Sequence, residues 1–395
     1  MTYKRDISEY DNFEIITDYN NLYAAHKKCR KGKLWKDSVA SYDLRAPECT
    51  LYLQSLLARG QYKISDYHRF TVNERGKTRQ IKSTQYKDRV VQKILNDNII
   101  VPAIQPTFCY ENSASQAEKG TNFALDLLRR HLREEVSKHG IGGYILICDF
   151  SGYFDSIRHD VVNDMYRSYF HDAKLVKLIT DIHASIPGGI GVPLGNQLSQ
   201  NDALMIASPM DHYIKERLHI RGYGRYMDDF YLIHHDKTYL QECLDNIRRI
   251  TKELGLTLNS KKTKISPMKA GIDFLGFHFY VTDSGKVISR IKAKSKSRWR
   301  EKIRKHKKKV LSGEMTYEQA KESFDSRKAH AKRGESYYLI RDMQFYFYTV
   351  FMDYLSEIEK AEYRKLKKEQ KYRNHKRRKR KNGKNLEQSA SRDAC

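Results

Sequence analysis

Apolar positions along this chain follow two patterns, a helical spacing in longer segments and short runs that are typical of strands. Leucines near helical spacing between basic residues predict helices over residues 1–60. The same spacing predicts an amphipathic helix over 121–138, with leucines inward and most arginines outward. Two more helices are predicted over 174–185 and 238–254, and Gly255 follows where a C-terminal cap belongs.

Short strand patterns interrupt these helices. Residues 67–72 and 77–81 predict a hairpin around a turn at 73–76. The apolar run Tyr-Ile-Leu-Ile-Cys-Asp at 144–149 is typical of a strand that is buried on both faces. Another hairpin is predicted within 274–288, and short strands are expected at 256–258 and 264–265. Helices mixed with short strands indicate an α+β chain.

Two adjacent acids, Asp228 and Asp229, lie within the apolar and aromatic stretch 225–233. The flanks predict two short strands, and the acids predict the tight turn between them. Two carboxylates on a rigid hairpin tip repel each other unless a cation binds there, and Mg²⁺ prefers such oxygen ligands. A solvated Asp-Asp turn has the same pattern, so the metal interpretation requires a partner acid and a nucleic-acid groove elsewhere.

Asp149 is the candidate third carboxylate. It ends the predicted buried strand 144–149, where an acid is unfavourable unless it has a partner. Asp149 could instead cap the next helix. Asp155 could equally provide that cap, so capping does not require Asp149.

Two further segments suit a phosphate-bearing ligand. Lys77 and Arg79, on the far arm of the first hairpin, could hold a triphosphate by charge-assisted hydrogen bonds, although a solvated basic hairpin would look the same. Glycines and prolines exclude regular structure from 187–196, and Gly195 leads into a helix predicted over 197–210. Such a junction lets backbone approach an anion at the helix N-terminus, but ordinary loop–helix junctions share the pattern.

Composition narrows the range of partners. The net charge of +26 favours a polyanion, with nucleic acid first and an acidic membrane surface second. The 28 tyrosines and 15 phenylalanines favour nucleic acid, because aromatic rings stack on bases. Six scattered cysteines without a CxxC pair suggest neither a zinc site nor a disulfide framework, and no apolar run is long enough to span a bilayer. We therefore expect a cytoplasmic protein with reduced thiols and no membrane partner.

The order of these segments resembles reverse transcriptases from about residue 61 to 290. The motifs that carry the resemblance are Lys77–Arg79 with Asp88–Val91 (fingers), Asp149–Ile157 (A), Gly191–Gln200 (B), Tyr226–Phe230 (C), Lys262-Thr263 (D) and Phe274–Phe277 (E). The resemblance implies a right-hand polymerase with fingers, a palm holding a small antiparallel sheet, and a helical thumb. The expected domains are an N-terminal helical extension (1–60), fingers and palm (61–290), a helical thumb (291–362) and a basic disordered tail (363–395).

The resemblance also implies an activity and its residues. The chain would be an RNA-directed DNA polymerase that synthesises cDNA by two-metal nucleotidyl transfer, using an RNA template, a DNA or RNA primer and dNTPs. Asp149, Asp228 and Asp229 would bind Mg²⁺, and Lys262 would be the general acid for pyrophosphate. Phe154 would be the gate that excludes a 2′-hydroxyl. The implied nucleotide-binding residues are Lys77, Arg79, Phe150, Phe154, Gly195, Asn196 and Gln197.

Motif B departs from the commonest pattern of the family. Leu194 replaces a Gln and Gln200 replaces a Pro that group II intron maturases carry. This variant resembles the enzymes of diversity-generating retroelements and some bacterial defence-associated relatives. Retron enzymes fit less well, since Met227 and Asp283 depart from their motifs. We therefore expect a bacterial retroelement or antiphage system, with a structured non-coding RNA and an accessory protein encoded nearby.

Two other functions fit the same motifs. One is a non-catalytic, maturase-like RNA-binding protein, which the intact set of three acids disfavours. The other is an RNA-templated RNA polymerase, which Phe154 disfavours.

Overall fold

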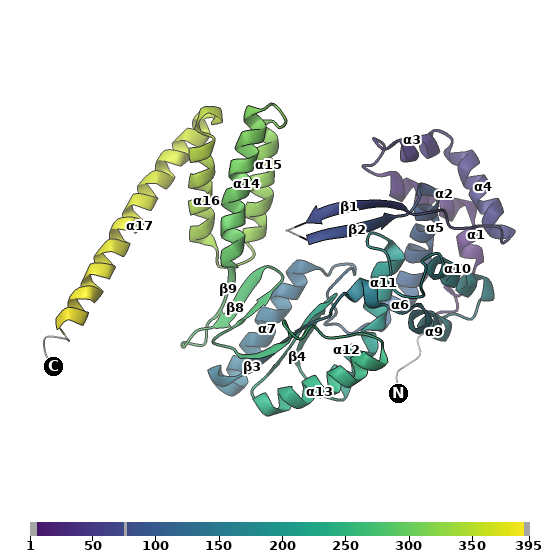
Figure 1. The fold of residues 1–395 in the computed structure, drawn as a ribbon, viewed down its shortest axis with the longest axis horizontal. Coiled ribbons are helices and arrows are strands. Elements are labelled where there is room, and N and C mark those ends of the chain that lie inside the picture. Colours follow the sequence, from purple (N-terminus) through teal and green to yellow (C-terminus); the bar gives the residue numbers. More distant parts are fainter. Residues whose placement is uncertain (1–5, 75–76, 391–395) are drawn as a thin grey trace. The chain divides into compact units, whose positions relative to one another are not determined.

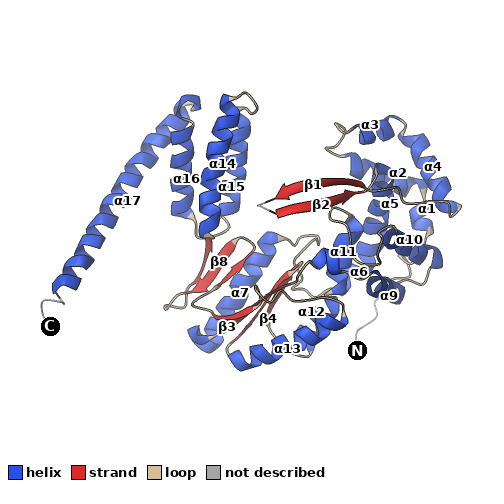
Figure 2. Cartoon of the chain, in the orientation of Figure 1, coloured by secondary structure: helices blue, strands red, loops and turns tan. Residues whose placement is uncertain are grey.

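The computed structural model describes residues 6–74 and 77–390 (Figure 1). The chain divides into two compact units, Met1–Met268 and Lys269–Cys395. Helices and short antiparallel strands occur in both units (Figure 2), in agreement with the predicted α+β class. Within the described ranges, no helix combines the length and the apolar character that crossing a membrane requires.

Four helices open the first unit: α1 (Glu14–Thr17), α2 (Tyr19–Arg30), α3 (Asp37–Leu44) and α4 (Ala46–Ala58). Of the apolar positions that predicted them, Leu22 and Leu53 are buried in the core, whereas Leu51 is exposed. The ring of His26 in α2 contacts a carboxylate oxygen of Asp43 at 3.0 Å and the hydroxyl of Tyr86 at 2.9 Å. These contacts tie α2 to α3 and to α5 (Tyr86–Ile94).

The predicted first hairpin is present as β1 (His68–Glu74) and β2 (Lys77–Ser83), with Val72 opposite Arg79. Beside it, the carboxylate of Asp88 in α5 accepts hydrogen bonds from the Tyr62 hydroxyl and the Ser65 amide, at 2.7 and 3.2 Å. The helical segments that follow α5 are η1 (Leu95–Ile100), α6 (Val101–Ile104), η2 (Gln105–Thr107), α7 (Thr121–His139) and η3 (Gly140–Gly142). The amphipathic helix predicted over 121–138 is thus confirmed as α7.

A four-stranded antiparallel sheet lies at the centre of the first unit. Its order is β4-β5-β3-β6. The strands are β3 (Tyr144–Asp149), β4 (Gly222–Tyr226), β5 (Asp229–His234) and β6 (Lys264–Pro267). Helix α7 packs against β4 and β5, and α13 (Lys237–Glu253) packs against β5, β3 and β6. Consecutive residues such as Ile145 and Leu146 are fully buried, so β3 is covered on both faces, as its apolar run predicted.

The remaining helices of this unit are α8 (Tyr153–Ser156), α9 (His159–Tyr169), α10 (Ala173–Ala184), α11 (Gln197–Ile206) and α12 (Ser208–Glu216). The prediction of a single helix over 197–210 was wrong. The segment is helical, but α11 ends at Ile206 and α12 begins at Ser208, with Ala207 between them. Pro209 lies in the first turn of α12, and proline has no amide hydrogen to continue the preceding helix. The strand expected at 256–258 was also wrong, since only Leu258 makes an isolated bridge, to Phe150.

The second unit pairs a small sheet with helices. Its elements are β7 (Ile272–Phe274), β8 (Phe277–Val281), β9 (Val287–Ile291), α14 (Ala293–Leu311), α15 (Tyr317–Ala331), α16 (Tyr337–Val350), η4 (Met352–Tyr354) and α17 (Glu357–Ala390). In its core, the ring of Phe324 stacks on Phe347 with centroids 4.4 Å apart and lies tilted against Trp299, with centroids 5.5 Å apart. The strands predicted within 274–288 belong to this unit, whereas the expected boundary at 290 placed them with the palm.

Residues 363–390 continue α17, where the composition predicted a disordered tail. Lys, Arg, Glu and Leu are good helix formers, so the segment has no intrinsic obstacle to a helix before Gly383. Ion pairs also attach α17 to α16: Arg341 pairs with Glu369, and Arg373 donates to Asp342 at 2.7 Å. The basic composition alone was therefore a poor guide to the structure of this segment.

Candidate active site

The turn between β4 and β5 is formed by Met227 and Asp228. Tyr226 pairs with Asp229 in the ladder, so Asp229 is the first residue of β5 rather than part of the turn that the sequence predicted. The reason is that Asp229 also pairs with Asp149 of β3 and is thereby drawn into the sheet. Met227 has φ 56°, a left-handed conformation that is costly for a residue with a side chain and is held by its surroundings.

The structure brings the three predicted carboxylates together. Asp149 ends β3 directly opposite Asp229, and facing residues in an antiparallel ladder have neighbouring side chains. The amide of Phe150 donates to the carbonyl of Asp228 at 3.2 Å, which fixes the hairpin tip beside the end of β3. Asp149 and the adjacent pair Asp228 and Asp229, which are far apart in the chain, therefore share one edge of the sheet.

Burial and mutual repulsion make Asp228 and Asp229 hard to ionise. Burial raises the pKa of Asp228, and the nearby charge of Asp149 adds to the effect. Burial, the charge of Asp228 and a hydrogen bond with Asp149 together raise the pKa of Asp229 to about 7. A cation placed among these oxygens would favour their ionised forms, and hard oxygen ligands suit a divalent cation of the Mg²⁺ type.

Lys262 lies at the same edge. Its Nζ is 2.5 Å from a carboxylate oxygen of Asp149. Partial burial lowers the pKa of Lys262, but the hydrogen bond and the charge of Asp149 outweigh it, so the net shift is upward. The amide of Asn259 also donates to the Asp149 carbonyl at 2.7 Å, which holds the loop that carries Lys262.

A buried ion pair beneath the hairpin is a feature that sequence reasoning missed. Arg225, 1% exposed, donates to both carboxylate oxygens of Asp211 in α12, and its Nη2 is 2.6 Å from Oδ2. The Tyr223 hydroxyl donates to the same carboxylate. Arg225 also donates from Nη1 to the carbonyl of Met227 at 3.2 Å and so supports the strained turn. The available signal was an arginine within the apolar run 225–233, where a charge requires a buried partner.

The residues predicted to grip the nucleotide lie in several elements. Arg79 on β2 is exposed, and its positive charge opposes the upward pKa shift of Asp228. Its charge is therefore felt at the acidic edge, the part of the sheet that carries Asp149, Asp228 and Asp229. The backbone of Lys77 begins β2, but its side chain lies outside the described residues. Phe154 is half-buried in α8, and its carbonyl accepts from the amide of Val192 in the Gly-rich loop at 2.8 Å.

The motif B residues shape the start of α11. Gly195 has φ 97°, and open space lies where a side chain would begin. Asn196 is buried and caps α11 by accepting from the Leu198 amide at 3.0 Å, while Gln197, the first helical residue, is half-buried. Backbone at Gly195 is accessible to a ligand, whereas the Asn196 side chain is occupied by the cap.

Phe150 has a different position from the other nucleotide-binding candidates. Its ring is 3% exposed and stacks on Tyr153 with centroids 4.9 Å apart, while Phe230 lies 5.5 Å away. The ring therefore packs in the core. Phe150 faces the site through its backbone, next to Asp149 and Asp228.

The match to a protein family agrees with this arrangement. Residues 68–279 match the family described as reverse transcriptase (RNA-dependent DNA polymerase). The chain is 23% identical over 267 residues to protein YkfC of Escherichia coli (strain K12), a match that covers 57% of this chain and 69% of that protein. A structure of apo telomerase from Candida tropicalis, truncated from its C-terminal domain, matches with a TM-score of 0.43 and 14% identity. That match covers 59% of this chain and 58% of the telomerase chain, less than two thirds of its length.

The small antiparallel sheet with acids at its edge and the family match define the class as a right-hand polymerase. The chain belongs to the reverse transcriptase family, whose match spans more than half of its length. It therefore carries the domain of an RNA-directed DNA polymerase, a nucleotidyltransferase of a family that uses divalent metal ions.

Proposed function

We propose that this protein synthesises cDNA on an RNA template by two-metal nucleotidyl transfer. Asp149 and Asp228 would hold two Mg²⁺ ions, with Asp229 beside them. The observation that carries the proposal is the meeting of these three carboxylates at one sheet edge. When bound, Mg²⁺ would lower the pKa of the primer 3′-hydroxyl and neutralise the triphosphate and the leaving pyrophosphate.

The residues around the acids supply the remaining chemistry. The primer 3′-hydroxyl would release its proton to water as its oxygen bonds to the α-phosphorus, and the bond from that phosphorus to the pyrophosphate oxygen would break. Lys262 would donate a proton to that oxygen, after its ammonium exchanges Asp149 for the phosphate. Arg79 would bind the triphosphate by charge-assisted hydrogen bonds, and Lys77, Gly195 and Gln197 would complete the proposed nucleotide contacts. Asn196 would contribute by positioning the start of α11 through its cap.

Phe154 is the proposed sugar gate. It lies in α8, five residues after Asp149, and its carbonyl accepts a hydrogen bond from the Gly-rich loop. An aromatic ring there would leave no room for a 2′-hydroxyl, so deoxynucleotides are the proposed substrates. Phe150 would act by positioning, since its buried ring holds motif A against the hairpin.

Primer extension tests the proposal. Purified protein with Mg²⁺, dNTPs and a primed RNA template should incorporate deoxynucleotides, and Asp228→Ala should lose activity by several orders of magnitude while binding RNA as before. Asp245→Ala, which removes an exposed acid of α13, is the matched control and should keep full activity. An inactive wild type that still binds RNA would favour the maturase-like alternative. Equal use of ribonucleotides would contradict the gate and favour an RNA polymerase.

For the biological setting, we propose a bacterial retroelement or antiphage system. Support comes from Leu194 and Gln200 in motif B, which resemble the enzymes of diversity-generating retroelements and defence-associated relatives. A structured RNA and an accessory protein encoded nearby would be the partners. The neighbouring genes test this: a variable repeat pair would indicate diversification, and a lone operon with a structured RNA would indicate defence.

A further inference from the structure

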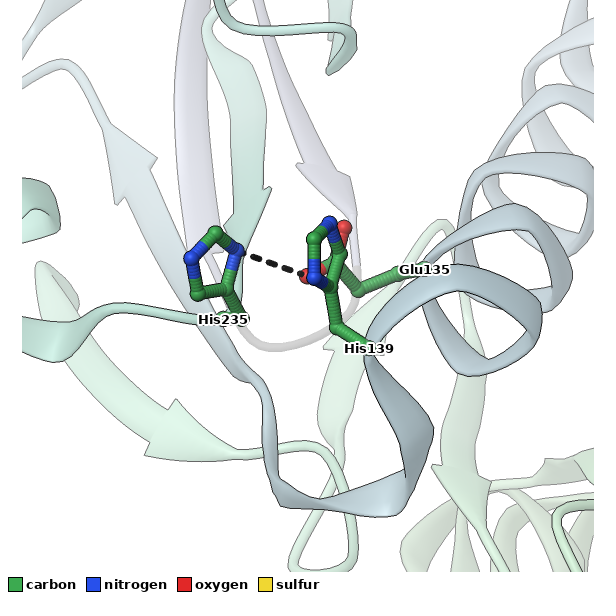
Figure 3. Close-up of side chains that lie close together, drawn as sticks. All are labelled: Glu135, His139 and His235. Atoms are coloured by element: carbon green, nitrogen blue, oxygen red, sulfur yellow. Dashed lines mark ion pairs between the residues drawn. The ribbon is translucent and has the colours of Figure 1, made fainter.

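Three potential metal ligands lie close together (Figure 3). They are at the end of β5 that is farther from Asp228 and Asp229. Glu135 and His139 lie one helical turn apart on α7, and His235 directly follows β5. One ligand atom from each side chain lies within 4.8 Å of the others. β5 begins at Asp229 and ends at His234, so the cluster lies about 20 Å along the strand from the catalytic acids.

The partners of these side chains leave their ligand atoms available. Oε1 of Glu135 is buried, lacks a hydrogen-bond donor within the described ranges, and lies 3.8 Å from Nδ1 of His235, the ion pair dashed in Figure 3. A buried carboxylate oxygen without a donor is costly. The rings of His139 and His235 stack with centroids 4.0 Å apart and make no hydrogen bond to described residues. A shared cation would satisfy all three groups at once.

The cluster also borders open space. A pocket of about 210 Å³ is lined by Glu135 and His139 together with His131, His219 and His234. His234 stacks on His235 with centroids 4.3 Å apart. The pocket has room for a water molecule at a further coordination position.

We propose that Glu135, His139 and His235 form a binding site for a divalent transition metal of the Zn²⁺ type, with water completing the shell. Two imidazoles and one carboxylate are a ligand set that Zn²⁺ accepts, whereas Mg²⁺ prefers oxygen ligands alone. Bound metal would clamp the C-terminal end of α7 to the end of β5. The site is independent of the proposed polymerase reaction, because neither helix α7 nor His235 contributes to the acidic edge.

Metal titration of the untagged full-length protein tests the site. After removal of metals with a chelator, calorimetry with Zn²⁺ in excess Mg²⁺ should give one ion per chain and a raised thermal unfolding temperature. His139→Gln and His235→Gln should each weaken Zn²⁺ binding by more than about tenfold. Their unfolding temperatures without metal should stay close to that of the wild type, since both side chains lie at least partly in solvent.

Two control variants locate the bound ion. His219→Asn changes a pocket residue outside the ligand set and should bind Zn²⁺ as the wild type does. Asp228→Ala should also keep the site, because it alters only the acidic edge. The proposal is overturned if the wild type binds no stoichiometric Zn²⁺, if the two glutamine variants bind it unchanged, or if Asp228→Ala abolishes binding.

Discussion

At the scale of single residues, burial and two neighbouring acids oppose the ionisation of Asp229. Burial removes the water that would stabilise its charge, Asp228 precedes it in the chain, and Asp149 faces it across the ladder. With a pKa raised to about 7, Asp229 is half-protonated near neutral pH when no cation is bound. Binding of the proposed Mg²⁺ ions would displace that proton, which would couple metal affinity to pH.

We expect the apparent Mg²⁺ affinity of the free protein to rise with pH and to level off above about 7. Below that pH, the proton on Asp229 competes with the metal, so affinity falls by up to about tenfold for each pH unit. Calorimetry in buffers of different ionisation enthalpy measures the released proton. Asp229→Asn should bind Mg²⁺ more weakly but without this pH dependence. An affinity that is constant between pH 6 and 8 would contradict the coupling.

The sequence predicted which acids belong to the site better than it predicted the residues that hold them in place. Asp149 and the pair at 228–229 were found because acids beside apolar strands are chemically unusual. Arg225 was not assigned a role, because its partner Asp211 lies outside the stretch 225–233 that contains Arg225. Only the fold brings the two side chains together. The close contact of Lys262 with Asp149 likewise depends on how the loop at Asn259 folds back.

At the scale of elements, the ion pair between Arg225 of β4 and Asp211 of α12 anchors the β4–β5 hairpin. Both side chains are buried, and Arg225 also supports the carbonyl of Met227 at the strained turn. The turn prediction failed by one residue because strand pairing across the sheet, rather than local turn preference, decides which residues leave the ladder.

We expect Asp211→Asn to cost about 3–5 kcal/mol of unfolding free energy, because the Arg225 charge is left buried without a counter-charge. The active-site turn should loosen as well, so the remaining folded protein should show a reduced rate of nucleotide addition. Urea denaturation and single-turnover extension measure the two effects. Asp245→Asn breaks an exposed pair with Arg248 and should change stability by less than about 0.5 kcal/mol. Equal effects of the two variants would rule out a special role for the buried pair.

At the scale of the whole molecule, a net charge of +26 is distributed unevenly along the sequence. Residues 363–384 carry a dense basic run, which predicted nucleic-acid binding from composition alone. The same composition wrongly predicted disorder, because ion pairs between α16 and α17 and the helix propensity of Lys and Arg favour a helix. The basic charge of this segment indicated a nucleic-acid partner, whereas ion pairs and helix propensity determined that the segment is helical.

Removing residues 376–395 should weaken RNA binding without changing polymerisation at saturating RNA. Each lost phosphate contact should flatten the slope of log affinity against log salt by about 0.7 for a single strand. Fluorescence anisotropy across a salt series measures that slope. A truncated protein with an unchanged slope would show that this segment does not contact the phosphates.

The claim at the centre of this account is that three acids, brought together by the palm sheet, hold the catalytic metal ions. A crystal of the protein with primed RNA template, a non-hydrolysable dNTP and Mn²⁺ tests it through anomalous scattering. We predict two Mn²⁺ peaks, both about 2.1 Å from carboxylate oxygens of Asp149 and Asp228. Metal peaks that Asp149 does not ligate, or a single ion held by the hairpin alone, would contradict the account.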